Sequence, residues 1–487
     1  MLAIEPLSKR VSASAWNSCD GTKRAIRFMK ATGLVVVAIL AMSLSLAKSA
    51  EARPNVLFIA IDDLRPQLGC YGQDEIKSPN IDRLAAQGTV FKRAYCQVAV
   101  CGASRASLLT GLRPTQNRFL SYKTYAEKDA PGAMTLPEEF RKNGYHCISN
   151  GKIFHHREDT AKRSWSEPAW KPTISGATPL HPESETMRGG TKNRGPVFEE
   201  PDVPDNAYPD GQTADKTIND LKRMKKEGKP FFLACGFLKP HLPLYAPKKY
   251  WDMYDRDTIT VADNQYSPAD APKSLLGSDE IHSYHNRNIK FNSDEWHRSC
   301  RHGYYACVSY VDAQVGKVLD ALDELGLRGN TIVILWGDHG WHLGEHNFWG
   351  KHNVMHLATN SPLIVSAPGF KARQRCERLV EFVDIYPSLC NLAGITTVNE
   401  RLQGTSFKPL LSAPGRPWKK VAFSKYGAAT SIVTDRYNYA EFTNGEKMLY
   451  DLEKDASENV NIAGAAEHQE LVDGLSKLLA AGGQRVP

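Results

Sequence analysis

The chain has 487 residues, of which 41% are hydrophobic and 24% are charged, and its formal net charge is +7. This composition is typical of a folded globular protein and excludes disorder as the dominant state. The first 52 residues hold seven Lys/Arg against three Asp/Glu, so the rest of the chain carries a net charge of only +3. Such a small charge gives no indication of binding to nucleic acid or to a membrane surface.

Residues 1–52 have the pattern of a secretory signal peptide. Basic residues from Lys23 to Lys30 precede an apolar run at 33–47, and Ala50-Glu51-Ala52 fits a signal-peptidase site. The run has about fifteen residues, which favours a signal peptide over the alternative, a membrane anchor. Met29 would be a normal start for it. We expect a periplasmic or secreted protein, and the absence of an Asn-x-Ser/Thr sequon favours a bacterial origin.

Short apolar runs bounded by turn residues recur along the chain, and they are typical of buried parallel strands. They cover 55–61, 147–149, 231–237, 331–336 and 362–366. Apolar residues at three- and four-residue steps predict helices between them, at 81–87, 136–143, 214–226 and 304–325. Strands that alternate with helices predict an α/β domain with a large, mostly parallel sheet sandwiched by helices.

Two long segments, 156–212 and 255–298, lack periodicity and are rich in Pro, Gly, Asp, Asn and Ser. Long irregular insertions in a compact domain are often functional, so we expect them to form walls of a substrate pocket. A stretch with three Pro and one Gly near 405–418 indicates a domain boundary.

Beyond that boundary the sequence predicts a small antiparallel sheet followed by a helix. Its strands are expected at 420–424, 431–434, 437–442 and 447–452, and the helix at 468–480. The predicted organisation is therefore a signal peptide (1–52), a catalytic α/β domain (53–412) and a small C-terminal subdomain (413–487).

The chain has ten cysteines, of which Cys19 lies in the leader. If Cys101 serves chemistry, an even number remains, which permits disulfides after export without fixing their pairing. None has the spacing of a zinc site. Cys147 and Cys235 lie in apolar runs and are more typical of buried free thiols.

Charged side chains follow four of the predicted strands. Asp62 and Asp63 come after the strand at 55–61, and Asp338 and His339 follow the strand at 331–336. Lys152 follows the run at 147–149, and Lys239 and His241 follow the strand at 231–237. The carboxyl ends of parallel strands meet at one edge of a sheet, where ligands bind. Three carboxylates there would repel one another unless a cation neutralised them, and oxygen ligands favour Ca²⁺ or Mg²⁺ over Zn²⁺. Taken alone, Asp62 and Asp63 fit an alternative equally well, in which one carboxylate caps a helix and the other is solvated.

The segment from Ala99 to Gly111 predicts a short helix that starts near Cys101. A helix N-terminus attracts anions, and Arg105, one turn further on, can reach the same anion. If this segment is considered in isolation, the alternative to an anion site is a buried cysteine that precedes an ordinary helix.

This segment, Cys-Gly-Ala-Ser-Arg at 101–105 followed by Leu-Leu-Thr-Gly at 108–111, resembles the first signature of the type I, formylglycine-dependent sulfatases. Residues 144–155, Gly-Tyr-His-Cys-Ile-Ser-Asn-Gly-Lys-Ile-Phe-His, resemble the second signature. The resemblance runs from about Pro54 to Asp451 and is closest to the iduronate-2-sulfatase branch, through matches at 62–66, 68–72, 239–243 and 338–346. The sequence departs from the pattern at Ala103, where Pro is usual, and at Cys147, where Ser or Thr is common.

The resemblance implies an alkaline-phosphatase-like fold, one Ca²⁺ per chain, and conversion of Cys101 to formylglycine (3-oxoalanine) by a formylglycine-generating enzyme. The implied metal ligands are Asp62, Asp63, Cys101 in its modified form, Asp338 and His339. The implied catalytic residues are Cys101, Arg105, Lys152, His155, His241 and Lys351. Lys152, His241 and Lys351 would also bind substrate, and Trp341 would stack on a sugar, although a packing role is the alternative for Trp341.

A sulfate ester resists attack because its oxygens shield the sulfur with negative charge. Ca²⁺, Arg105, Lys152 and Lys351 would neutralise those oxygens while one hydroxyl of the hydrated aldehyde at position 101 attacks. His241, helped by Lys351, would protonate the leaving alcohol. His155 would deprotonate the second hydroxyl so that sulfate is expelled. Without the motifs, both histidines would be more typical of a protein core.

The implied reaction is hydrolysis of sulfate esters, with the 2-O-sulfate of a uronic acid in a glycosaminoglycan or other sulfated polysaccharide as the expected target. Basic residues of the irregular segments are candidates for pairing with the uronate carboxylate: Lys192, Arg194, His285, Arg287 and Lys290. The alternatives are a sulfatase for another sugar, a phosphonate or phosphate monoesterase of the same fold, and a non-catalytic binder of sulfated glycans. The expected partners are the saccharide and the maturation enzyme, without nucleic acid or stable membrane association.

Overall fold

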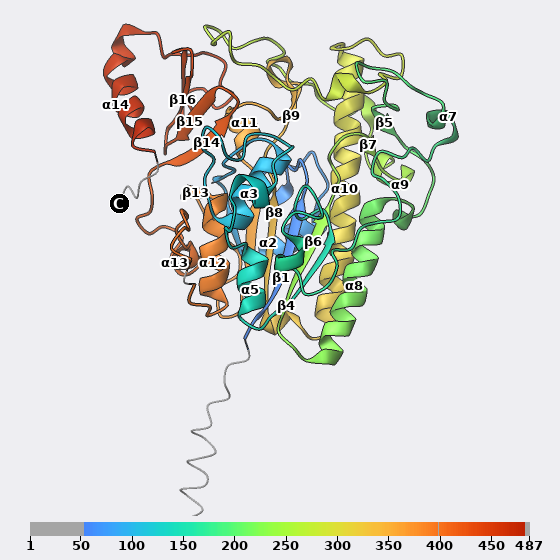
Figure 1. Cartoon of the computed structure of the whole chain (residues 1–487). Helices are drawn as coiled ribbons and strands as arrows, with labels where there is room; N and C mark the ends of the chain where they lie inside the picture. Colours follow the sequence, from blue (N-terminus) through green and yellow to red (C-terminus); the bar gives the residue numbers. More distant parts are fainter. Residues whose placement is uncertain (1–52, 398, 483–487) are drawn as a thin grey trace, which may run out of the picture. The chain divides into compact units, whose positions relative to one another are not determined.

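The computed structural model describes residues 53–397 and 399–482 (Figure 1). The predicted signal peptide lies outside these residues. The main sheet has seven strands. The strand order is β12-β2-β11-β8-β1-β6-β4. The strands are β1 (Asn55–Ile61), β2 (Thr89–Phe91), β4 (His146–Gly151), β6 (Phe231–Phe237), β8 (Thr331–Gly337), β11 (Leu363–Ser366) and β12 (Gln374–Cys376).

Four neighbouring strands, β4, β6, β1 and β8, are parallel to one another, as predicted. The prediction that 362–366 forms a parallel strand was wrong, because β11 is antiparallel to both β8 and β2. Parallel neighbours need a long crossover. Between β8 and β11 the chain forms only short elements and re-enters the sheet from the edge at which it left. An apolar run predicts burial, but it contains no information about strand direction.

Helices cover both faces of the sheet, which explains why β1 is an unbroken apolar run. Val56, Phe58 and Ala60 face a core that includes α3 (Cys101–Thr110), α5 (Leu136–Lys142) and α12 (Ile385–Leu392). The alternate residues Leu57, Ile59 and Ile61 face a second core formed with α2 (Pro79–Ala86), α8 (Pro209–Glu227) and α10 (Asp294–Glu324). Figure 1 shows α8 and α10 side by side along one side of the sheet.

Two of the predicted helices begin earlier than their apolar spacing indicates. Helix α10 starts at Asp294, ten residues before the predicted start, and the Ser293 side chain caps it by accepting a hydrogen bond from the Trp296 N–H. Helix α8 starts at Pro209, five residues early, with proline in its first turn. Proline and cap residues favour helix starts, but neither belongs to the apolar repeat from which the starts were predicted.

The C-terminal residues form the predicted antiparallel sheet and helix. The strands are β14 (Ala422–Tyr426), β15 (Ala429–Val433), β16 (Tyr437–Phe442) and β17 (Lys447–Asp451), and the helix is α14 (Gln469–Ala480). Helix α14 packs on one face of this sheet through Val472, Leu475 and Leu479. The other face packs against Leu275 and Met355. The subdomain boundary at 412/413 stays a prediction.

The segments predicted to be irregular contain only short elements before α8 and α10 begin. They include α6 (Ala161–Ser164), α7 (Pro182–Glu185) and β5 (Phe198–Glu199) in the first segment, and single 3₁₀ turns at Arg256–Thr258 and Ile281–Ser283 in the second. Apart from further 3₁₀ turns, the other short elements are β3 (Ala94–Tyr95), α4 (Ala126–Asp129), β7 (Leu244–Tyr245), α9 (Lys248–Trp251), β9 (His342–Leu343), β10 (Trp349–Gly350), α11 (His356–Thr359), β13 (Val380–Glu381) and α13 (Lys408–Ser412).

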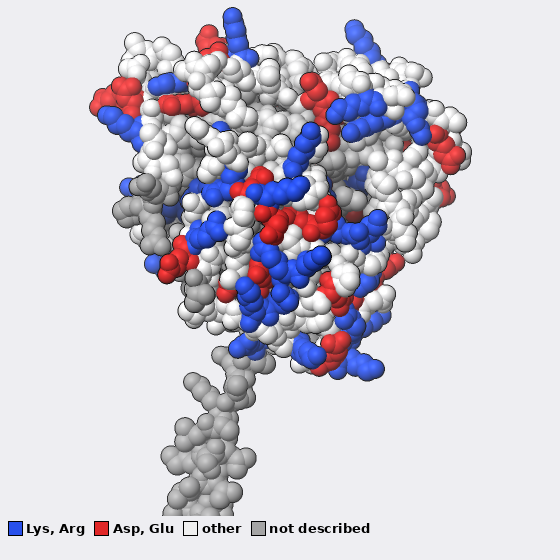
Figure 2. All heavy atoms as spheres, viewed as in Figure 1, with Lys and Arg blue, Asp and Glu red and all other residues white. Residues whose placement is uncertain are grey.

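All nine cysteines among the described residues are free thiols, so the disulfides permitted among the eight cysteines other than Cys101 do not form there. Cys147 and Cys235 are buried, as predicted. Within residues 53–397 and 399–482, no helix combines the length and the apolar character that crossing a bilayer requires. On the face seen in Figure 2, Lys and Arg are interspersed with Asp and Glu, without one continuous basic surface.

Candidate active site

The predicted strand-end residues meet at one edge of the sheet. In the pairing of β1 with β8, Ile61 lies opposite Gly337, so Asp62-Asp63 and Asp338-His339 leave the sheet at the same level. The Asp63 N–H donates to Asp338 Oδ1 at 3.0 Å. All four side chains are fully buried. The register of two neighbouring strands therefore brings together residues that are about 275 positions apart.

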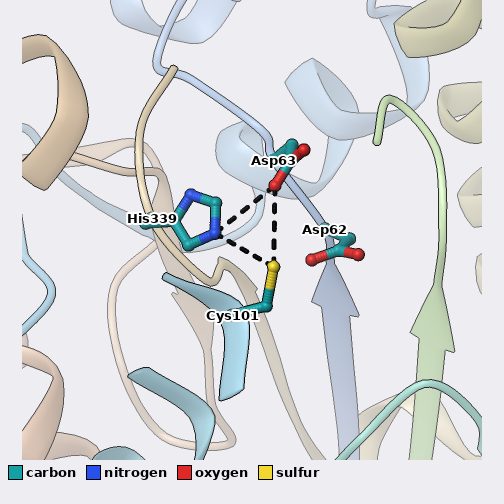
Figure 3. Close-up of side chains that lie close together, drawn as sticks. All are labelled: Asp62, Asp63, Cys101 and His339. Atoms are coloured by element: carbon teal, nitrogen blue, oxygen red, sulfur yellow. Dashed lines mark hydrogen bonds and ion pairs between the residues drawn. The ribbon is translucent and has the colours of Figure 1, made fainter. Parts of the chain in front are cut away.

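Cys101 is the first residue of α3 and points at this group (Figure 3). Its sulfur lies 3.3 Å from His339 Nε2 and 3.9 Å from Asp63 Oδ1. The next residue must be small, because a Cβ on Gly102 would lie 2.5 Å from the backbone oxygen of Tyr122. Burial, together with the negative charge of Asp62, raises the pKa of the Cys101 thiol to about 11. An unmodified thiol here is therefore neutral at pH 7.

The three predicted cations pair with the three carboxylates. Arg105 Nε donates to Asp338 Oδ2 at 2.8 Å, and its Nη2 donates to Asp62 Oδ1 at 3.4 Å. Lys152 Nζ donates to Asp62 Oδ2. Lys351 Nζ donates to both oxygens of Asp63 at 2.9 and 3.0 Å.

Arg105 differs from the two lysines because none of its nitrogens is free. Its remaining nitrogen, Nη1, donates to the backbone oxygens of Lys152 and Ile153. The side chain is fully buried, whereas Lys152 and Lys351 line the cavity described below. Arg105 therefore orients the carboxylates and fixes the end of β4, whereas the two lysines are the cations that face the cavity.

Asp63 is the carboxylate whose negative charge the neighbouring groups stabilise less well than that of Asp62. Burial raises the pKa of Asp63 to about 7 in spite of Lys351, and the charges of Asp62 and Asp338 act in the same direction. Burial also acts to raise the pKa of Asp62, but Lys152, His241 and Arg105 hold it well below its usual range. Carboxylates that share a buried site in this way are typical of a cation site.

The donor set fits a hard divalent cation. One ligand atom from each of Asp62, Asp63, Cys101 and His339 can be chosen so that all lie within 4.8 Å of one another. Carboxylate oxygens dominate, with one imidazole nitrogen, and this set suits Ca²⁺ or Mg²⁺. The Cys101 sulfur marks where the side chain of a modified residue 101 would begin. Asp338 Oδ1 lies 3.5 Å from His339 Nε2, so all five predicted ligands belong to one group.

Both predicted catalytic histidines lie beside this group. His241 Nδ1 is 2.6 Å from the backbone oxygen of Leu242, which leaves Nε2 directed toward Asp63 at 4.0 Å and Glu280 at 3.6 Å. His155 has its ring 6.2 Å from the Tyr122 ring, and its buried Nδ1 has no hydrogen-bond partner among the described residues. Burial, with the nearby charge of Lys152, lowers the pKa of His155 to about 2, so this imidazole is neutral.

A cavity of about 1210 Å³ opens above the group. Its floor includes Cys101, Lys152 and Lys351, and its walls come mainly from residues 171–179, 188–195, 238–242 and 279–284. The two irregular segments therefore form much of the wall, as predicted. The wall carries four cationic side chains from the first segment: Lys171, Arg188, Lys192 and Arg194.

The structure separates the residues that were predicted to recognise the sugar. Lys192 and Arg194 line the cavity, whereas His285, Arg287 and Lys290 are not among its lining residues. The Arg287 guanidinium instead packs on the Phe198 ring at 5.4 Å. Trp341 is only 1% exposed and lies beneath Lys351, whose Nζ is 4.8 Å from the ring, which favours its packing role over stacking on a sugar.

Two residues of the cavity, Tyr122 and Glu280, were not predicted from the sequence, because neither belongs to a recognisable pattern. Tyr122 is 53% exposed and lines the cavity next to Cys101 and His155. Glu280 contacts both Lys351 and His241. Each lies in an irregular segment outside the matched motifs, so only the folded chain brings them to the site.

Comparison with known proteins agrees with this geometry. The family described as Sulfatase matches residues 54–395, and the family described as N-sulphoglucosamine sulphohydrolase, C-terminal, matches residues 344–484. The chain belongs to the sulfatase family, and the structure has the alkaline-phosphatase-like fold expected from the sequence.

Among the relatives, human iduronate 2-sulfatase is 33% identical over 477 residues, which cover 82% of this chain and 84% of the relative. A sulfatase from Formosa agariphila is 33% identical over 447 residues, covering 88% and 86% of the two chains. A phosphonate monoester hydrolase from Silicibacter pomeroyi shares the fold with a TM-score of 0.73 at 22% identity, covering 88% and 94%. The protein is a sulfuric ester hydrolase similar to the iduronate 2-sulfatases.

Proposed function

We propose that this sulfatase is exported, depends on Ca²⁺ and on a formylglycine at position 101, and removes the 2-O-sulfate of a uronic acid in a glycosaminoglycan or other sulfated polysaccharide. One observation carries the proposal: a buried Asp/Cys/His group of metal-binding type lies at the floor of a large cavity with cationic walls. The similarity to iduronate 2-sulfatases supports the choice of sugar.

Asp62, Asp63, Asp338, His339 and residue 101 would hold the cation. When present, Ca²⁺ supplies a positive charge that polarises a sulfate oxygen, and formylglycine supplies the paired hydroxyls for attack and release. The residues of the chain provide the rest. Lys152 and Lys351 bind the outer sulfate oxygens from the cavity floor, and Arg105 keeps the carboxylates of Asp62 and Asp338 in place.

The two histidines divide the proton transfers. His241 Nε2 is directed into the site, because Nδ1 is held by the Leu242 oxygen, so it can deliver a proton to the departing alcohol. His155 lines the cavity near Cys101, where its imidazole is placed to accept a proton. One histidine placed to donate a proton and one placed to accept a proton therefore flank the floor of the cavity.

The cavity fits a saccharide with several negative charges. Its volume of about 1210 Å³ exceeds the ~300–1,000 Å³ of an ordinary ligand pocket, which favours an oligosaccharide over a single sugar. Lys171, Arg188, Lys192 and Arg194 can pair with a uronate carboxylate or with further sulfates. The exposed ring of Tyr122 offers the stacking surface that Trp341 does not.

The maturation of Cys101 is tested by mass spectrometry of the tryptic peptide 94–105. This peptide also contains Cys96, a buried thiol without any proposed role, which serves as an internal control. We expect the mass loss of formylglycine formation once and only at position 101. A peptide with two intact thiols in enzyme that releases sulfate would contradict the proposed chemistry.

The substrate is tested by sulfate release from matched saccharides. We expect the matured enzyme to prefer a 2-O-sulfated uronate oligosaccharide over a 6-O-sulfated hexosamine and over a small aryl sulfate. Aryl phosphate and phosphonate esters test the alternative activity of the shared fold. Ready turnover of aryl sulfates without any release from 2-O-sulfated uronates would overturn the assignment of the sugar.

A further inference from the structure

Glu280 places a negative charge in a cavity that has to bind anions. It lies in the second irregular segment, directly before the 3₁₀ turn at Ile281–Ser283, and its side chain is 22% exposed. Burial acts to raise the pKa of its carboxyl, but the charges of Lys351 and His241 hold that pKa far below its usual range. A carboxylate here repels a sulfate ester, so its presence calls for a physical reason.

The contacts of Glu280 supply that reason. Its Oε2 lies 3.1 Å from Lys351 Nζ, and its Oε1 lies 3.6 Å from His241 Nε2. Lys351 follows β10 and His241 follows β6, so one carboxylate bridges two groups from different parts of the fold.

Without this bridge, neither group is fixed from the cavity side. Lys351 Nζ is bound to the two oxygens of Asp63 and rests on the Trp341 ring, so it is held mainly from below. His241 has one hydrogen bond, through Nδ1, and its Nε2 lies 4.0 Å from Asp63, beyond hydrogen-bond distance, so the ring can still tilt. Glu280 contacts the other end of the imidazole and the open side of the ammonium group.

We propose that Glu280 is a positioning residue, whose two carboxylate oxygens hold Lys351 Nζ and His241 Nε2 at the spacing that a sulfate ester requires. This inference rests on the proposed functions of Lys351 and His241. It assigns Glu280 no contact with the reacting atoms.

The proposal predicts opposite effects on binding and on turnover. Removing the negative charge relieves a repulsion, so anion binding does not weaken. Losing the bridge leaves the ammonium and imidazole groups less well oriented in the transition state, so turnover falls. A carboxylate that accepted a hydrogen bond from a sugar hydroxyl would behave differently, because its loss would raise KM.

The test compares the matured, metal-loaded wild-type enzyme with its Glu280→Gln variant. We expect kcat to fall about 10- to 100-fold for a small aryl sulfate while KM stays equal or falls, which is the pattern of lost transition-state stabilisation. A small aryl sulfate has no uronate, so an error in the proposed sugar does not affect the result. The inhibition constant of inorganic sulfate, measured in parallel, should stay equal or fall.

The matched control is Glu295→Gln. Glu295 is an exposed carboxylate in the first turn of α10, outside the cavity lining, so its change removes the same charge without breaking the bridge. We expect its kcat and KM to match those of the wild type. Glu280→Asp keeps the charge but is one methylene shorter, so it should retain more activity than Glu280→Gln. It also provides a second test of the bridge if Glu280→Gln does not fold. Unchanged kcat in both Glu280 variants, or a rise in KM that explains the whole loss, would overturn the proposal.

Discussion

The floor and the walls of the cavity are built in different ways. The charged residues of the floor follow strands or lie on α3, and the register of β1 with β8 fixes the relative positions of the carboxylates. The walls are irregular segments with exposed cations, connected by isolated bridges such as Gly189–Arg194 and Pro196–His285 and not by the large sheet. Under the proposed function, the chemistry depends on a rigid scaffold, whereas the choice of saccharide depends on loops that can vary without disturbing that scaffold.

The most severe test of the floor is Cys101→Ala. Because the paired hydroxyls of formylglycine cannot form on alanine, we expect kcat to fall by about 10⁴-fold or more with the fold retained. Sulfate release and circular dichroism measure the two effects. Cys147→Ala makes the same change at a buried thiol without a proposed role and should leave kcat close to that of the wild type. Full activity in Cys101→Ala would refute the mechanism.

The second test concerns the metal. In Asp63→Asn one carboxylate ligand becomes a neutral amide, so we expect loss of bound Ca²⁺ and at least a ~100-fold loss of activity. Elemental analysis should find one Ca²⁺ per wild-type chain and much less in the variant. Chelation followed by Ca²⁺ should restore the wild type and not the variant. Stoichiometric zinc together with an active variant would show that the floor is a different kind of site.

A change in the wall should act on the sugar alone. Arg194 lines the cavity and is held by Tyr284, with the guanidinium 5.1 Å from the ring and Nη1 3.1 Å from the hydroxyl oxygen. Loss of a charge-assisted hydrogen bond in Arg194→Ala should raise KM for a sulfated uronate oligosaccharide about 10-fold and leave aryl sulfate kinetics unchanged. Arg287→Ala is the matched control, because Arg287 stacks on Phe198 outside the cavity lining. Equal effects on both substrates would mean that wall and floor are not separable.

The smallest expected effect concerns Tyr122. If its ring stacks on a sugar, Tyr122→Ala should raise the saccharide KM about 3- to 10-fold, since aromatic contacts of this kind are worth about 1 kcal/mol. Tyr122→Phe keeps the ring and should resemble the wild type. Leu120→Ala removes another exposed apolar side chain of the same loop and controls for surface effects. If the Ala and Phe variants had the same saccharide KM, the ring of Tyr122 would not stack on the sugar and the prediction would be wrong.

How far the sequence predicts the molecule follows the same division. The strands at 55–61 and 231–237 were predicted to the residue, because a strand buried on both faces is a continuous apolar run. The metal-type group followed from the strand ends, because parallel strands bring their carboxyl ends to one edge. The strand ends also placed Lys152 and His241 at this edge, and motif resemblance added His155 and Lys351. The structure places all four around that group.

The sequence failed where position depends on contacts between distant segments. The direction of β11 depends on how the chain returns to the sheet, and no apolar pattern records it. Trp341 follows the strand-end motif in sequence but is turned beneath Lys351, and the exposed aromatic side chain is Tyr122 from another loop. Glu280 belongs to an irregular segment, and its partners are about 40 and 70 positions away, so only folding brings them together.

The burial of α3 also determines whether the proposed conversion of Cys101 comes before or after folding. All ten residues of this helix are buried, and the backbone of Tyr122 lies against Gly102 directly beside Cys101. A maturation enzyme has to seat several residues around the thiol in its own active site, and the folded chain does not expose them. The conversion that we propose at Cys101 therefore has to take place on the newly made chain, before the loop around Tyr122 closes. Protein that folds first would stay a thiol, stable and inactive, so the ratio of active to total protein would record which of the two processes was faster.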